Sequence, residues 1–305
     1  MKALRNVLVG IDFSEPSDNA LREAARIAAW DGAELVALNV LDENILDRAR
    51  NEIDLPVDNV LAEATRRLRQ HVEDILGPGH PGVRSEFVLG HPFKEMVAMA
   101  NQIDADLIVL GSHGVIREDE PYRVGTLATR CIRKAKPNVL IVRDWQDGPF
   151  EKVCACIDFS QPSRDAAMAA LHIAQQDEAA LDFLHVHLPL RSLAADPGLG
   201  LGGMPVYSAA DDAELLKQIQ GKLARFADEV ADGCPHGSHV YSEFSLRRGI
   251  VDYLKASSPD LVVINTRGHT QIRNLLIGSA AEKIIHEADC STLVIKPDGF
   301  RYELD

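Results

Sequence analysis

Residues 11–17 read Ile-Asp-Phe-Ser-Glu-Pro-Ser, and nearly the same phrase, Ile-Asp-Phe-Ser-Gln-Pro-Ser, returns at residues 157–163. Six of the seven positions are identical, and the two copies start 146 residues apart. Each copy ends a short apolar run and opens a helix-like stretch. The chain is therefore one structural unit written twice, and its function is to be sought in what each unit binds and where the copies differ.

The bulk composition suits a globular protein with two cores. At 305 residues the chain is long enough for two domains of ordinary size. Its 46% hydrophobic and 26% charged residues are typical of soluble proteins. The net charge of −14 divides into −5 for residues 1–146 and −9 for residues 147–305. Neither half offers the basic face that nucleic-acid binding needs, so we expect no nucleic-acid partner.

The N-terminal residues enter a strand pattern directly, without an apolar leader, and no apolar run is long enough to cross a bilayer. We therefore expect a cytoplasmic protein without membrane insertion. The five cysteines are odd in number and scattered over both halves, which does not indicate a disulfide framework.

Strand and helix patterns alternate along both halves. The strands are continuous apolar runs, which suit parallel strands covered by helices on both faces. We predict them at residues 6–12, 35–41, 84–89, 106–111 and 139–143, then at 152–158, 180–187, 239–245, 260–265 and 292–296. Helical patterns such as residues 20–30, 166–175 and 280–288 lie between them. The fold class is thus α/β, with two tandem doubly wound five-stranded parallel sheets of Rossmann-like type.

The polar segment 144–150, which holds Gly-Pro, is the predicted linker. It divides the chain into one domain at residues 1–146 and a second at residues 147–305. Long loops follow the second strand of each half, at about residues 42–58 and 189–212. The glycine-rich second loop is interpreted as a surface loop, with a mobile flap as the alternative, because it leaves the carboxyl end of a strand where such sheets bind ligands.

A glycine loop follows the fourth strand of each half. The first half has Gly-Ser-His-Gly at 111–114, ten further residues, and Gly-Thr at 125–126. The second half has Asn-Thr-Arg-Gly at 265–268, nine further residues, and Gly-Ser at 278–279. Glycine lets the backbone approach a ligand closely, and the free N–H groups of the helix start attract an anion. Because the arrangement occurs twice, it predicts phosphate binding.

These features together resemble the universal stress protein family in its tandem two-domain form, over nearly the whole chain. The pattern Gly, two residues, Gly, nine residues, Gly and then Ser or Thr marks the ATP-binding members of that family. The resemblance implies ATP, with or without Mg²⁺, as the ligand. It also implies that an aspartate ending the first strand faces adenine and ribose, and that a valine of the second strand lines the adenine pocket.

Carried onto this sequence, the implied contacts fall at matching places in both halves. In the second half they are Asp158, Val186, Asn265, Gly268, Gly278 and Ser279. In the first half they are Asp12, Val40, Gly111, Gly114, Gly125 and Thr126.

Neither half matches the pattern fully. The first-half loop is one residue too long and carries three acidic residues at 118–120, which would repel a triphosphate. The second half has the nine-residue spacing, but Asn265 replaces its first glycine. Asparagine tolerates a left-handed backbone better than most residues, although its side chain would crowd a ligand. We predict that the second half is the better nucleotide site.

Other polar side chains have competing interpretations. Cys154 and Cys156 share one face of a strand, as do His185 and His187 on the next strand, so a zinc site is an alternative to core packing. Two flat strands wrap poorly around one ion, so we predict no metal. His113 and His269 lie in the glycine loops, either as phosphate contacts or as exposed residues.

The leading functional prediction is a stress-response regulator that binds ATP without efficient catalysis. The alternatives are a slow ATPase and an ATP-free member that binds an apolar or lipid-like ligand. The sequence contains no Gly-Lys-Ser/Thr phosphate loop and no Gly-x-Gly-x-x-Gly directly after a first strand, and no catalytic set of side chains stands out. We therefore assign no catalytic residue and expect weak ATP hydrolysis at most.

Single-domain members of the resembling family pair through their last strands. A tandem chain can make that contact internally, between residues 139–143 and 292–296, which would cover two exposed sheet edges. The resemblance thus implies an intramolecular pseudo-dimer, which leaves room for a further homodimer. It names no protein partner.

Overall fold

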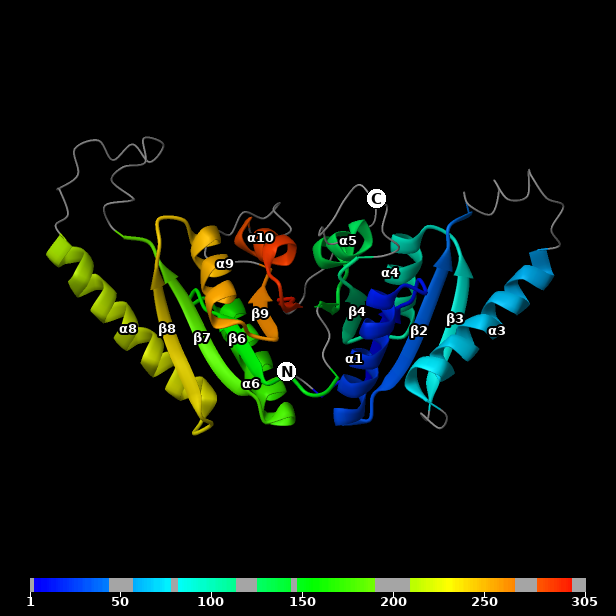
Figure 1. Ribbon diagram of the computed structural model, residues 1–305, viewed down its shortest axis with the longest axis horizontal. Coiled ribbons are helices and arrows are strands. Elements are labelled where there is room, and N and C mark those ends of the chain that lie inside the picture. The colour runs from blue at the N-terminus through cyan, green and yellow to red at the C-terminus, as the bar shows by residue number, and fades with distance from the viewer. Residues whose placement is uncertain are drawn as a thin grey trace. The chain divides into compact units, whose positions relative to one another are not determined.

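The computed structural model describes residues 3–43, 57–77, 82–113, 125–143, 147–189, 209–266 and 279–297. Residues 2–145 form one compact unit and residues 146–297 another (Figure 1). Each unit alternates strands and helices, as the sequence predicts.

The first unit is a five-stranded parallel sheet with helices on both faces. Its strands lie in the order β3-β2-β1-β4-β5, and every neighbouring pair is parallel. Along the chain the elements are β1 (Asn6–Gly10), α1 (Glu15–Asp31), β2 (Glu34–Leu41), α3 (Val57–Leu76), β3 (Val83–Leu89), α4 (Pro92–Gln102), β4 (Leu107–Gly111), α5 (Thr126–Lys134) and β5 (Asn138–Val142). From β1 the chain builds the sheet in one direction through β2 and β3, and it then returns to add β4 and β5 on the other side of β1.

The second unit repeats this topology, with its strands in the order β8-β7-β6-β9-β10. Its elements are β6 (Lys152–Cys156), α6 (Gln161–Asp177), β7 (Ala180–His187), α8 (Ala209–Ala231), β8 (His236–Ser242), α9 (Leu246–Ser257), β9 (Leu261–Asn265), α10 (Ser279–Glu287) and β10 (Ser291–Ile295). The predicted doubly wound parallel sheet is confirmed in both halves.

One strand lies three residues earlier than the sequence pattern predicts. We expected residues 239–245, whereas β8 pairs His236 with Leu181 and ends where Ser242 pairs with His187. Ser245 then caps α9 by accepting the backbone N–H of Arg248 at 3.4 Å. The capping preference of serine therefore assigns residues 243–245 to the turn and helix start rather than to the strand.

The repeated phrase forms the start of α1 and of α6. Ser14 caps α1 by accepting the backbone N–H of Ser17 at 3.4 Å, and proline follows in the first turn, where its missing N–H costs nothing. Ser160 caps α6 in the same way at 3.3 Å. Helix α1 ends at Gly32, whose φ of +67° suits glycine.

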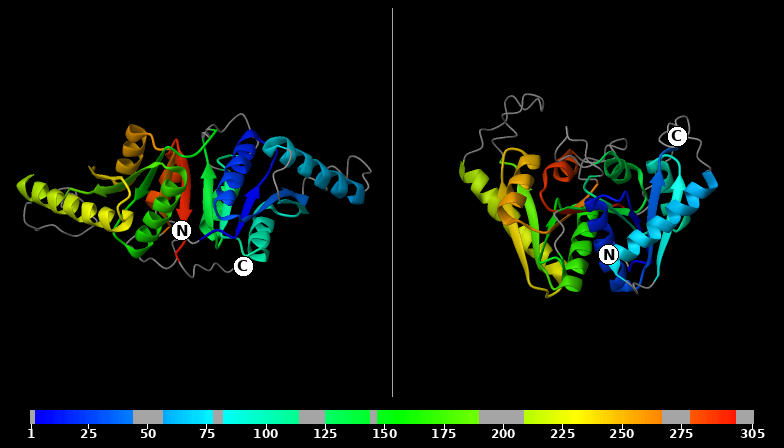
Figure 2. Two further views of the ribbon diagram at one scale, coloured as in Figure 1. Left: turned by 90° about the horizontal axis from the view of Figure 1, so that it is seen from below. Right: turned by 45° about the vertical axis from the view of Figure 1, so that its right-hand side comes forward.

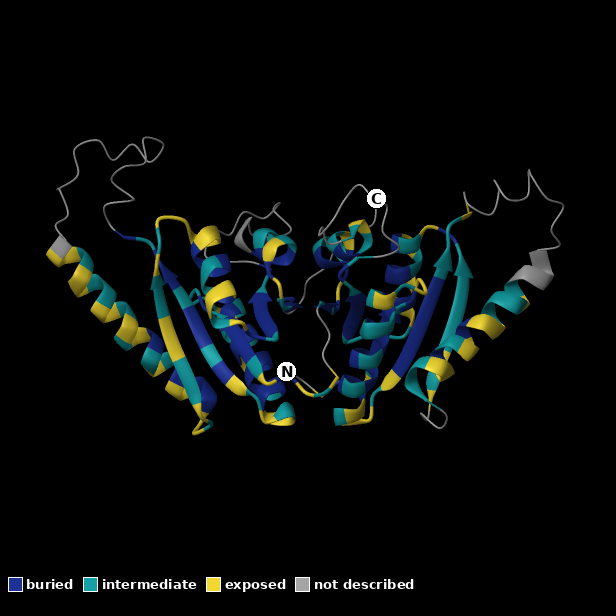
Figure 3. Ribbon diagram, in the orientation of Figure 1, coloured by how far each residue is buried: buried dark blue, intermediate teal, exposed yellow. Residues whose placement is uncertain are grey.

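Helices cover both faces of each sheet (Figure 2). In the first unit α1 packs on α3 and α4 packs on α5, and in the second unit α6 packs on α8 and α9 packs on α10. The central strands are almost fully buried, whereas the outward faces of the helices are exposed (Figure 3). This layering leaves the carboxyl ends of the strands, where the loops emerge, as the edge at which a ligand site can form.

Candidate functional site

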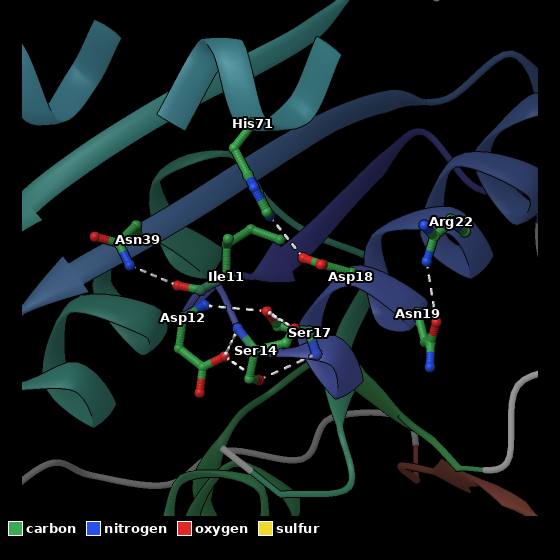
Figure 4. Close-up of polar contacts among 9 residues, drawn as sticks. All are labelled: Ile11, Asp12, Ser14, Ser17, Asp18, Asn19, Arg22, Asn39 and His71. Carbon is green, nitrogen blue, oxygen red and sulfur yellow. Dashed lines mark hydrogen bonds and ion pairs between the residues drawn. The ribbon is translucent and has the colours of Figure 1, made fainter. Parts of the chain in front are cut away.

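The turn after β1 holds its aspartate in a fixed orientation (Figure 4). The Asp12 carboxylate accepts the backbone N–H of Ser14 at 3.1 Å through Oδ1, and the same oxygen accepts the Ser14 hydroxyl. In the second half Asp158 repeats both bonds with Ser160, at 2.9 and 2.5 Å. Because the turn uses Oδ1 of Asp12, the other carboxylate oxygen is available to a ligand.

A bulky residue occupies a left-handed backbone conformation inside each turn. Phe13 has a φ of +62° and Phe159 a φ of +63°, which large side chains rarely adopt. Phe13 is 46% exposed and contacts the edge of the His71 ring, whose Nε2 lies 2.6 Å from Asp18. Strained conformations of this kind persist where the surroundings fix them, which is common beside binding sites.

A side chain from the second strand ties down the residue before the aspartate. Asn39 donates its amide to the carbonyl of Ile11 at 2.7 Å (Figure 4), and His185 Nδ1 makes the same contact with Ile157 at 2.7 Å. Both halves therefore position their aspartate by one device, built from different residue types. Burial lowers the pKa of His185, and the contact with Ile157 opposes that shift without reversing it.

A cavity of ≈ 310 Å³ lies at the carboxyl edge of the first sheet. Its walls come from the ends of β1, β2 and β4 and the first turns of α4 and α5. The lining residues are Gly10, Ile11, Asp12, Ser17, Leu38, Val40, Pro92, Met96, Leu110, Gly111, His113, Gly125, Thr126, Leu127 and Ala128. Aliphatic side chains form most of this wall, and a few polar groups lie at the strand and helix ends. This combination is typical of a small-molecule site.

Glycine is required at the end of β4. A Cβ on Gly111 would lie 2.7 Å from the backbone carbon and oxygen of Pro16, too close for any side chain. At Gly10 an added Cβ would come within 2.8 Å of Met96 Cε and 2.6 Å of Leu110 Cδ2, which are side-chain ends that can move aside. Gly111 thus lets the start of α1 approach β4, and Gly10 leaves space in the cavity at the end of β1.

Helix α5 begins at this cavity, and no side chain among the described residues caps its start. Gly125 is the N-cap residue and makes no side-chain capping bond, and the first turn carries no acidic residue. Its own N–H donates to the carbonyl of Ser112 at 2.9 Å, which closes the glycine loop. The free N–H groups and the helix dipole make this end favourable for an anion.

The structure brings together most of the predicted first-half contacts. Five of them line the cavity, namely Asp12, Val40, Gly111, Gly125 and Thr126. Gly114 and the acidic residues 118–120 lie outside the described residues. His113 also lines the cavity, and its Nδ1 lies 2.9 Å from Ser112 Oγ, so the ring is oriented rather than free in solvent.

Sequence reasoning missed other parts of this wall. Leu38 precedes Val40 by two residues and so shares its face of β2, a signal the strand period supplied. Met96 comes from α4, which no motif in the sequence connects to the site.

The second-half candidates are described in part. Asp158 and Asn265 are half-buried at the ends of their strands, and Ser279 begins α10. Gly268, Gly278, His269 and the loop at residues 190–208 lie outside the described residues.

Val186 is buried under α9, because Gly249 has no side chain and its Cβ would lie 2.8 Å from Val186 Cγ1. The equivalent Val40 borders open space. The two halves therefore differ at the predicted adenine position, and the preference for the second half stays a prediction.

The cysteine and histidine pairs of β6 and β7 face different surroundings. Cys154 is fully buried, and a hydrogen bond with Cys156, together with burial, raises its pKa well above the ordinary value. His187 is buried, and burial lowers its pKa. Within the described ranges, no three His, Cys, Asp or Glu side chains gather closely enough to hold a metal ion. None of the described helices is long and apolar enough to cross a bilayer.

The fold and the cavity define a class of protein: a tandem pair of doubly wound α/β units, the first of which has a ligand-sized cavity at the carboxyl ends of its strands. A model of the universal stress protein family matches the chain twice, at residues 3–143 and 149–296. The chain therefore belongs to the universal stress protein family and carries two such units in tandem.

Curated relatives match about half of the chain each. The universal stress protein MJ0577 of Methanocaldococcus jannaschii is 25% identical over 154 residues, which cover 46% of this chain and 94% of the relative. The universal stress protein Rv1636 of Mycobacterium tuberculosis is 28% identical over 151 residues, covering 47% and 98%.

A solved universal stress protein structure from Archaeoglobus fulgidus covers 97% of this chain and 99% of its own, with a TM-score of 0.62 and 17% identity. At that identity the likeness establishes the fold.

Proposed function

We propose that this protein is a stress-response regulator that binds an adenine nucleotide, ATP in the first instance, and does not turn it over efficiently. The observation that carries the proposal is the first-half cavity. It joins an aliphatic wall, suited to a purine ring, to a carboxylate at Asp12 and to the uncapped start of α5. A base, a ribose and a phosphate group each find a matching surface there.

The described residues support binding more strongly than catalysis. The cavity wall contains one carboxylate, Asp12, and one imidazole, His113, and Oδ1 of that carboxylate is already committed to the turn. Efficient hydrolysis needs a positioned water and groups that stabilise the developing charge on the phosphate. We therefore keep slow ATP hydrolysis as the second candidate.

An apolar or lipid-like ligand is the third candidate. It is favoured by the aliphatic character of the wall, which includes Leu38, Met96 and Leu110. Such a ligand would fill the cavity without using Asp12 or the α5 N-terminus.

The first test is to denature the purified protein with acid and to identify and quantify the released small molecules by mass spectrometry. Retained adenine nucleotide supports the leading proposal, and phosphate release above background from added ATP supports the ATPase. A co-purified apolar molecule supports the third candidate. An empty protein that also fails to take up ATP would sink the nucleotide proposal.

Two matched variants decide which half binds. Gly125→Glu places a carboxylate at the start of α5, where the nearest non-neighbouring atom of the described residues is 3.9 Å from an added Cβ, so repulsion of phosphate is the main effect expected. Gly278→Glu makes the same change at the equivalent sequence position of the second half. Gly221→Glu on α8 controls for added charge, because its Cβ meets nothing closer than 3.7 Å. Loss of ATP binding in one variant and not the other assigns the working half.

A further inference from the structure

The helix start of α4 carries a histidine whose two ring nitrogens both face hydrogen-bond donors. His91 is the N-cap residue, and its Nδ1 accepts the backbone N–H of Phe93 at 3.2 Å. A neutral imidazole accepts a hydrogen bond at one nitrogen only, and we assign that role to Nδ1, which caps the helix, and the ring hydrogen to Nε2. His91 therefore presents an N–H donor outward from the start of α4.

A second donor faces this one directly. Arg130 Nη1 lies 3.3 Å from His91 Nε2, and a guanidinium donates hydrogen bonds but cannot accept them. The guanidinium carbon of Arg130 lies 5.1 Å from the centre of the Phe93 ring, a cation–π contact that holds it in place. Two N–H donors thus converge without an acceptor between them.

The charges nearby do not resolve this contact. In the part of the chain that the structure describes, neither His91 nor Arg130 forms an ion pair with a carboxylate. Glu95, the acidic residue in the first turn of α4, has its carboxyl group against Gly90, since a Cβ there would lie 2.7 Å from Glu95 Oε1. Helix capping accounts for His91 Nδ1. The Nε2–H group of His91 and the Arg130 guanidinium, two hydrogen-bond donors, still face each other.

An oxyanion resolves the contact, because its oxygens accept from both groups at once. His91 and Arg130 are exposed and lie next to the cavity rather than in its wall. Pro92, which follows His91, lines the cavity, and so does Thr126, which precedes Arg130 by one helical turn on the same side of α5. The equivalent places in the second half hold Ser245, the cap of α9, and Lys283, which pairs with Glu287 at 3.3 Å.

We propose that His91 and Arg130 form an oxyanion subsite beside the first-half cavity, which receives a phosphate group of the ligand seated there. This inference rests on the proposed function. It adds a contact outside the glycine loop and makes the first half, but not the second, selective for phosphorylated over unphosphorylated ligands.

The test compares wild-type protein with Arg130→Gln in titrations with adenosine, AMP and ATP by calorimetry. We expect Arg130→Gln to weaken AMP or ATP about tenfold, the usual effect of losing a charged hydrogen bond, and to leave adenosine within about twofold. Arg133→Gln removes the same charge from the same helix and should leave all three affinities unchanged. Equal losses for adenosine and nucleotide, or no loss for either, would overturn the subsite.

His91→Asn separates capping from anion binding. Asparagine is a good N-cap, so α4 should keep its stability, whereas the Nε2–H donor disappears. We expect this variant to unfold at the same urea concentration as wild type and to bind AMP or ATP severalfold more weakly. A variant that binds nucleotide as tightly as wild type would count against the role of His91.

A nucleotide-free readout keeps the inference testable if the proposed function fails. In that case neither adenosine nor any adenine nucleotide binds wild-type protein. Inorganic phosphate is then titrated while the ¹⁵N signals of the His91 imidazole are followed. A saturable shift in wild type that is lost in Arg130→Gln supports the subsite, and an unchanged His91 signal refutes it.

Discussion

Gly111→Ala tests the close approach between β4 and α1. The added Cβ would lie 2.7 Å from the backbone carbon and oxygen of Pro16 and 2.9 Å from its Cβ, where ordinary contacts begin near 3.4 Å. Backbone atoms of a capped helix start cannot rotate away as a flexible side chain would. The start of α1, which carries the turn at Asp12, must therefore shift.

The expected magnitude follows from two opposing effects. Replacing glycine by alanine stabilises a compatible site by about 0.4–1 kcal/mol, because the unfolded chain loses freedom. Overpacking of this severity costs about 1–3 kcal/mol. We therefore expect Gly111→Ala to lower the free energy of unfolding of the first half by about 1–2 kcal/mol. Gly125→Ala, with 3.9 Å of clearance, should be neutral or slightly stabilising.

Urea denaturation followed by tryptophan fluorescence measures this difference in the right half of the molecule. Trp30 lies on α1, so its fluorescence, followed in a Trp145→Phe background, reports the unfolding of the first unit. The affinity of Gly111→Ala for ATP should fall as well, because Asp12 moves with α1. A Gly111→Ala protein as stable as Gly125→Ala would refute the argument that β4 and α1 are in obligatory contact.

Three further predictions address the differences between the halves. Burial lowers the pKa of His185 in the folded chain, so below roughly pH 6.5 the unfolded state binds more protons than the folded state and the free energy of unfolding falls. His185→Asn should make the free energy of unfolding depend less steeply on pH, as measured by urea titrations at several pH values with hydrogen exchange in β7 as the readout. Shortening residues 115–124 by one and neutralising residues 118–120 should strengthen ATP binding to the first half, measured by calorimetry with Gly278→Glu as background; no gain would mean that this half lacks more than loop chemistry. A Cβ on Gly237 would overlap the Asp182 carboxylate and displace its contact with His239, so Gly237→Ala should lower the urea midpoint of the second half by the equivalent of about 1 kcal/mol, and a midpoint equal to wild type would mean that these side chains move aside without cost.

Most of the fold was predictable because its signals are local and occur twice. Continuous apolar runs predicted nearly every strand, and the Ser-x-Pro phrase predicted the starts of α1 and α6. The exception was β8, an edge strand that pairs with β7 and carries polar residues such as His239 and Ser242. In such a strand the register depends on the partner strand and on the following helix cap rather than on its own hydrophobicity.

The sequence predicted the site residues that the backbone conformation requires, but it did not predict those that reach the site through the packing of helices on the sheet. Asp12 and the glycines of the loop could be recognised in the sequence because turns and helix starts need those residue types. Met96 and Gly249 gave no such signal, since their importance comes from how closely α4 and α9 approach the sheet. The contact between His91 and Arg130 joins residues 39 positions apart, and a single sequence contains nothing that pairs them.

The replacement of Asn39 in one half by His185 in the other has an evolutionary consequence. In a homodimer of identical subunits every substitution appears twice, so both sites change together. Joining two copies in one chain frees each to drift alone while the other preserves the ancestral role. The two halves of a tandem chain can thereby respond differently to the same conditions, and the half-buried imidazole of His185 makes the second half the more sensitive to acidity.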